Sequence, residues 1–161
     1  MYKLIQIVFL LSLILILTGC NSTEERKAEG LIKEYYQSMI DGNYEKAFEQ
    51  LHLFQYDGRT DDYKLDEEFS LSAEEAKEFY LKKVEISQEK GYQLINFEIG
   101  EVEYEDGHSF WHHIKLQTEH NGQEFEWNET ASIYNGRLLI GGDDPFQIYR
   151  DGRMNFDIEG F

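Results

Sequence analysis

The sequence predicts an α+β domain, with helices in its first half and an antiparallel sheet in its second half. Two capping-box patterns, Ser22-x-x-Glu25 and Ser72-x-x-Glu75, each open a segment with apolar residues at helical spacing. From residue 92 onward, Asp-Gly and Asn-Gly pairs separate segments in which apolar and polar residues alternate. Such pairs favour the two-residue turns of β-hairpins, so the second half is predicted to be a meander.

Three helices are expected before the sheet. The first runs from the Ser22 cap to Asp41-Gly42, the second from Tyr44 to about Leu51, and the third from Ser72 to Gly91. The first helix is predicted to bury one face, made of Ala28, Leu31, Ile32, Tyr35, Tyr36 and Met39. The acidic segment 52–70 is predicted to be irregular, with short strands near Leu53–Tyr56 and Phe69.

The turns fix the strand register, because two-residue turns let cross-strand partners be counted outward from them. Counting from Asn121-Gly122 pairs His112 with Ala131, Ile114 with Glu129, and Leu116 with Trp127. Counting from Asp106-Gly107 pairs Leu116 with Phe97, Ile114 with Ile99, and His112 with Glu101. The apolar residues then share one face, which predicts a four-stranded meander over 92–142. Asp151-Gly152 predicts one more hairpin turn.

The N-terminus carries a secretory signal. Lys3 precedes an apolar stretch from Leu4 to Leu17, which is shorter than the roughly 20 residues of a membrane-spanning helix. The ending Leu17-Thr18-Gly19-Cys20 resembles the lipobox of bacterial lipoproteins, and Cys20 is the only cysteine. That resemblance implies cleavage of residues 1–19 and acyl chains, such as palmitate, on Cys20. The expected layout is a signal peptide (1–19), a short tether (20–22) and one domain (23–161), lipid-anchored at the extracytoplasmic face of the cell membrane.

The order of predicted elements points to a family. The segment from Tyr35 to Phe48 contains a helix end, Gly42-Asn43-Tyr44 and then Ala47, and it resembles a start common in NTF2-like (cystatin-like) proteins. The resemblance implies a cone in which three N-terminal helices pack on a curved antiparallel meander of four or more strands. A cystatin-type sheet with a single helix is the alternative architecture.

Charge limits the partners. The formal net charge is −17, and a field of that sign repels nucleic-acid phosphates, so nucleic acid is excluded as a partner. A basic partner stays open. No phosphate-binding glycine loop is present, so no cofactor is expected. No metal site is expected either, since His112 and His113 point to opposite faces of a strand, and His108 lies about 13 Å from His112 at strand rise.

One polar group stands out on the predicted buried face. Glu101 is expected opposite His112, with Glu129 one diagonal step away on the other neighbouring strand. Carboxylates on both sides are expected to raise the pKa of the imidazole. NTF2-like isomerases and dehydratases use a His or an acidic residue as a base in the cone, so the resemblance gives this group a catalytic interpretation. The alternative, which we favour at this stage, is a satisfied structural ion pair.

A second feature lies on the predicted outer face, where Val102, Trp111 and Leu139 line up across neighbouring strands. An exposed apolar stripe favours a contact surface, for a homodimer or for a membrane-proximal protein. Alternatively, the tail 145–161 folds over it. The leading functional hypothesis is a non-enzymatic binding or accessory domain that holds a small apolar ligand in its cone. An isomerase or dehydratase using His112, and a purely protein–protein interaction module, are the alternatives.

Overall fold

The computed structural model describes residues 21–57, 62–65, 71–105 and 109–155. Its helices are α2 (Asn21–Ile40), α3 (Tyr44–Gln50) and α4 (Ala73–Glu89), followed by the short 3₁₀ helix η1 (Gln147–Tyr149) near the end. Its strands are β1 (Gln55–Asp57), β2 (Asp62–Lys64), β3 (Tyr92–Tyr104), β4 (Phe110–His120), β5 (Gln123–Tyr134) and β6 (Arg137–Gly142). The predicted signal peptide (1–19) and Cys20 lie outside the described residues.

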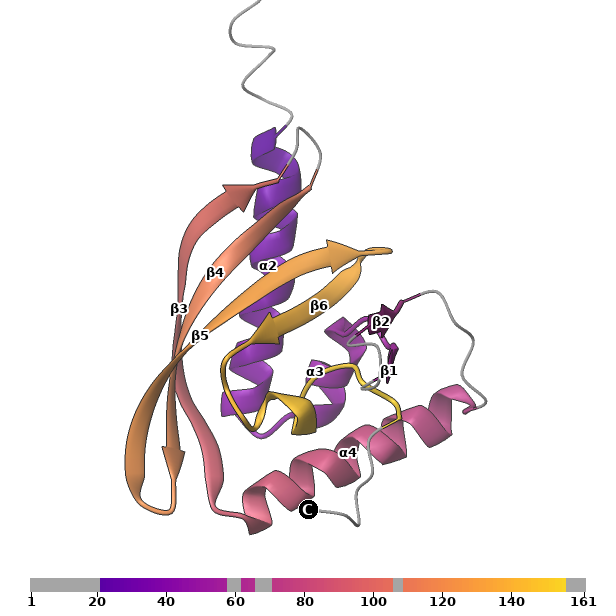
Figure 1. The fold of residues 1–161 in the computed structure, drawn as a ribbon, viewed down its shortest axis with the longest axis vertical. Helices are drawn as coiled ribbons and strands as arrows, with labels where there is room; N and C mark the ends of the chain where they lie inside the picture. Colours follow the sequence, from indigo (N-terminus) through magenta and orange to yellow (C-terminus); the bar gives the residue numbers. More distant parts are fainter. Residues whose placement is uncertain (1–20, 58–61, 66–70, 106–108, 156–161) are drawn as a thin grey trace, which may run out of the picture.

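The predicted fold class is confirmed. Within the described residues, three α-helices precede a four-stranded antiparallel sheet of order β3-β4-β5-β6, and β1 and β2 form a separate small hairpin. Figure 1 shows the long helix α2 lying across the hollow face of the curved sheet, with α4 below it. This is the element order that the NTF2-like resemblance implies, and the presence of three helices argues against the single-helix alternative.

The helices follow their sequence signals with one exception. In α4, the Ser72 hydroxyl accepts from the Glu75 amide (3.3 Å) and the Glu75 carboxylate accepts from the Ser72 amide (2.7 Å), which is the predicted capping box. The expected cap at Ser22 is wrong, because α2 already includes Asn21 and Ser22 lies within its first turn. Gly42 ends the helical region at φ 73°, a left-handed conformation that glycine adopts without strain.

The meander has the predicted register over most of its length. His112 pairs with Ala131, Ile114 with Glu129 and with Ile99, and Leu116 with Trp127 and with Phe97. Asn121 and Asn135 both take positive φ, as the two-residue turns require. The turn at Asp106-Gly107 lies outside the described residues.

One part of the predicted register is wrong. Between the pairs Ile99–Ile114 and Val102–His112, β3 contains one residue more than β4, which is a β-bulge. Val102 therefore lies opposite His112, and Glu101 is exposed. Gly100 lies in the bulge, where an added Cβ would approach the carbonyl oxygen of His113 to 3.2 Å. A glycine inside a strand pattern is the sequence signal for such an irregularity.

The C-terminal tail also differs from the prediction. Asp151-Gly152 forms no hairpin turn, because both residues are buried and neither adopts positive φ. The Phe54 amide donates to the Gly152 carbonyl, and the Met154 amide donates to the Phe54 carbonyl, each at 2.9 Å. The tail is thus bonded along the segment that follows α3. Within the described part of the chain, no helix has the length and apolar character that crossing a membrane requires.

Candidate functional site

His112 lies on the hollow face of the sheet beneath the N-terminal half of α2. Its side chain is 0% exposed, and neither ring nitrogen has a hydrogen-bond partner among the described residues. The ring packs edge-on against Phe110, with centroids 5.6 Å apart. Burial lowers the pKa of His112 below its ordinary value of 6.5, while Glu29 and Glu25 of α2 oppose that shift. The expected rise in this pKa is therefore wrong, because the group that faces His112 across β3 is Val102 and not a carboxylate.

Glu129 is buried as predicted, but it binds a residue that the sequence analysis did not anticipate. Arg150, from the tail, reaches Glu129 with both terminal nitrogens, at 3.1 Å from Nη1 to Oε2 and through Nη2 to Oε1. The Tyr36 hydroxyl of α2 donates to Glu129 Oε2 at 2.6 Å. Burial raises the pKa of Glu129, and the Arg150 guanidinium is the largest influence that lowers it.

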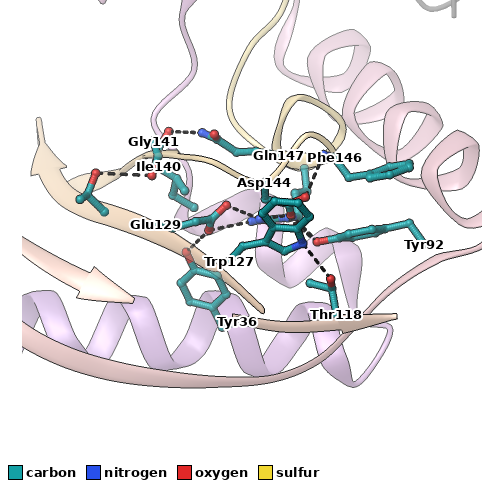
Figure 2. A network of polar contacts seen from close by, with 12 residues as sticks. Tyr36, Tyr92, Thr118, Trp127, Glu129, Ile140, Gly141, Asp144, Phe146 and Gln147 are labelled. Atoms are coloured by element: carbon teal, nitrogen blue, oxygen red, sulfur yellow. Dashed lines mark hydrogen bonds and ion pairs between the residues drawn. The ribbon is translucent and has the colours of Figure 1, made fainter. Parts of the chain in front are cut away.

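The Arg150 network extends to a second acid. Nη2 of Arg150 lies 2.7 Å from Oδ2 of Asp144, and the same oxygen accepts from the Tyr92 hydroxyl at 2.5 Å. Figure 2 shows four of these side chains pointing toward one another from separate elements: Tyr36 from α2, Tyr92 from β3, Glu129 from β5, and Asp144 from the segment after β6. The Tyr35 hydroxyl donates to the Arg150 carbonyl at 2.7 Å. Since these groups are buried and bonded to one another, this part of the cone holds the protein's own side chains.

A second buried ion pair fixes the same tail to α4. Lys83 Nζ contacts Asp151 Oδ1 at 3.2 Å and also reaches the carbonyl oxygens of Ile148 (2.9 Å), Asp151 (3.0 Å) and Arg153 (2.8 Å). Both charged side chains are 0% exposed. Burial lowers the pKa of Lys83, and Asp151 opposes that shift. Because breaking a buried pair leaves an uncompensated charge, these contacts hold the tail firmly in place.

The structure therefore does not bring the predicted group of three together. Glu101 is exposed in the bulge, Glu129 is bound to Arg150, and His112 is hydrogen-bonded to neither of them. The geometry offers His112 no carboxylate partner to orient its ring, which an acid–base residue ordinarily has.

The predicted outer stripe is also rearranged by the bulge. Val102 pairs with His112 and so lies on the inner face, while Glu103 takes its place opposite Trp111. The rest of that outer surface is mostly polar. The described part of the tail does not cover Trp111 either, since Phe146 stacks on Tyr92 at 4.6 Å, at the far end of β3. Trp111 and Leu139 are both half-buried and belong to a cavity.

That cavity lies where the sheet divides. Pairing between β4 and β5 ends at His112–Ala131, whereas β4 stays paired with β3 to Phe110 and β5 stays paired with β6 to Tyr134. Figure 1 shows β3 and β4 continuing beside α2 while β5 and β6 bend away. We call the gap between Phe110–Trp111 and Ser132–Tyr134 the fork.

The fork pocket has a volume of about 480 Å³. Its apolar and aromatic walls come from both branches of the sheet and from the residue that follows β2, and they are formed by Leu65, Phe110, Trp111, Ile133, Tyr134 and Leu139. Its polar rim includes Glu24 and Lys27 of α2 and Glu105 at the end of β3. A concave, mostly apolar cavity with a few polar groups is the usual form of a small-molecule site. This pocket is the candidate functional site.

Sequence reasoning identified Trp111 and Leu139 but assigned them to an exposed contact surface or to a surface covered by the tail. It missed the tail residues Asp144 and Arg150 and the helix residue Lys83. For Lys83 a signal existed, because it lies at helical spacing on the buried face of α4 with Ala76, Tyr80 and Ser87. A charged residue at such a position predicts a buried partner elsewhere in the chain.

Comparisons with known proteins assign no family to this chain. No protein-family model matches the sequence, and no curated protein matches it. Among solved structures, the chain is similar to an NTF-2 like protein of unknown function from Burkholderia xenovorans LB400. The two are 13% identical with a TM-score of 0.42, over 75% of this chain and 86% of that chain.

Proposed function

We propose that this protein is a lipid-anchored, non-enzymatic binding domain on the extracytoplasmic face of the cell membrane, and that it holds a small apolar ligand in the fork pocket. The lipobox-like ending at Cys20 supports the anchor and the location. The observation that carries the binding role is the fork pocket itself, an apolar cavity formed by two separating strands.

The filled part of the cone favours this role over catalysis. Arg150, Asp144 and Tyr92 occupy the interior near Glu129, and His112 is sealed beneath α2 and Phe110. In the part of the chain that the structure describes, no side chain fills the fork pocket in this way. A ligand is therefore expected between the branches of the sheet and not in the deep part of the cone.

A fluorescent apolar probe tests the binding role. N-phenyl-1-naphthylamine is titrated into residues 21–161, and saturable binding of one probe per chain is expected. Leu139→Ser, in the pocket wall, should weaken binding about tenfold, because it removes apolar surface from the site. Phe125→Ser is the matched control, since Phe125 is 37% exposed and pairs with Thr118 near the opposite end of β5 from the fork. Non-saturable binding, or equal losses in the two variants, would count against the proposal.

A further inference from the structure

We infer that the fork pocket selects organic cations, meaning ligands that join an amine or quaternary ammonium group to an apolar body. This inference rests on the proposed function of the same pocket and names the chemical class of its ligand. Three features of the pocket point to a cation: its aromatic walls, its carboxylate rim and the charge of the whole chain.

The aromatic walls favour a cation directly. Phe110, Trp111 and Tyr134 all line the cavity, and they come from two strands that separate at the fork. The faces of aromatic rings carry partial negative charge, so a cation placed over them is attracted, most strongly by tryptophan. The apolar body of a ligand also gains binding energy by burying its surface against the same rings. The cationic group and the apolar body of one ligand can therefore both contact this aromatic wall.

The rim adds full negative charges. Glu24 comes from the first turn of α2, and Glu105 directly follows β3; both line the cavity. Lys27 is the one cationic side chain among the lining residues, so the carboxylates outnumber it.

The positive end of α2 is the main argument for an anion instead. A helix N-terminus attracts negative charge within its first turn. Here Glu24 already lies in that turn and supplies the negative charge. A ligand anion would meet Glu24, Glu105 and the field of a chain with net charge −17, whereas a cation is attracted by all three.

Three small probes with one apolar body test the inference. They are 3-phenylpropyl-trimethylammonium, 3-phenylpropanol and 3-phenylpropionate, each titrated into residues 21–161 by calorimetry at low salt. We expect the cation to bind about tenfold more tightly than the alcohol, and the anion to bind least well. Raising the salt concentration should reduce the difference, because exposed charges are screened.

Variants locate the selectivity in the pocket. Glu24→Gln combined with Glu105→Gln should lower the cation-to-alcohol affinity ratio to about threefold or less. The control pair, Glu124→Gln with Glu126→Gln, makes the same change in net charge on exposed positions of β5 and should keep the ratio near tenfold. A similar drop in both pairs would mean that the whole field, and not the pocket, selects the cation, and would overturn the inference.

The outcomes separate the two proposals. Equal affinity for the cation and the alcohol, with both lost in Leu139→Ser, would overturn the cation preference and leave the apolar binding role standing. Tightest binding of the anion would also overturn it. Failure of all three probes, together with failure of N-phenyl-1-naphthylamine, would remove the binding role itself.

Discussion

Arg150 joins the C-terminal tail to the middle of the sheet, where its guanidinium binds the carboxylate of Glu129 on β5 through both terminal nitrogens. The pair is fully buried and separated by 21 residues in sequence. Asp144 shares the same guanidinium, so one cation faces two carboxylates. This arrangement makes the tail part of the core and determines which part of the cone stays open to a ligand.

Replacing Arg150 should be strongly destabilising. Arg150→Ala leaves Glu129 and Asp144 buried without their cation, and breaking such a pair costs about 3–5 kcal/mol of unfolding free energy. Urea unfolding followed by circular dichroism measures the loss. Lys115→Ala is the control, because Lys115 is exposed on β4 and should change stability by less than about 0.5 kcal/mol. A loss below 1 kcal/mol in Arg150→Ala would contradict the structural role of the network.

The contribution of His112 to the stability of the domain should fall as the pH is lowered from 7.5 towards 5.5. Burial lowers the pKa of His112 in the folded state, so below about pH 6.5 the unfolded chain binds more protons than the folded chain at this residue. The stabilising contribution of neutral His112 is therefore fully present above the pKa that the residue has in the unfolded chain. It is lost as the pH falls towards the lower pKa that His112 has in the folded protein.

His112→Leu should remove this pH dependence and stabilise the protein. The substitution eliminates two buried nitrogens without partners, each of which costs about 1–3 kcal/mol. His113→Gln is the control, because His113 is exposed on the opposite face and bonded to Glu103. Unfolding free energies measured between pH 5.5 and 7.5 test both variants. An unchanged slope in His112→Leu would show that His112 does not titrate as its burial requires.

The fold was largely predictable because its signals are local. Helical spacing, the Ser72 capping box and the turns at Asn121 and Asn135 each act within a few residues. The site was less predictable because it depends on two non-local features. The bulge at Gly100 places Val102 on the inner face of the sheet. The Asp151-Gly152 pair has the sequence of a turn, but Asp151 instead makes a buried contact with Lys83. A pattern of residues shows that Lys83 needs a partner, but not which segment supplies it.

Replacing Gly152 or Gly30 with alanine should change the stability of the protein in opposite directions. An added Cβ at Gly152 would lie 1.8 Å from the carbonyl oxygen of His52, so Gly152→Ala should cost more than 2 kcal/mol or prevent folding. Gly30 lies inside α2 with nothing within 4 Å of an added Cβ, so Gly30→Ala should stabilise by about 0.5–1 kcal/mol. Thermal unfolding of both variants checks the pair. Equal effects would mean that the tail does not pack against the segment after α3 as described.

The anchor gives the last prediction. If Cys20 carries the acyl chains, Cys20→Ser in the full-length chain should leave the precursor uncut and should abolish incorporation of labelled palmitate. Ser12→Ala, within the same signal segment, should keep both processing and label. If Cys20 is lipidated, helix α2, which includes the next residue Asn21, follows the anchor directly, and Glu24 on the rim of the fork pocket lies about 4.5 Å along the helix from Asn21. The pocket should therefore be held close to the bilayer surface, where a fluorophore attached to a cysteine introduced at position 27 is quenched by lipid-borne quenchers. Palmitate incorporation that persists in Cys20→Ser would refute the lipid anchor, and an unquenched fluorophore in the anchored protein would refute the membrane-proximal pocket.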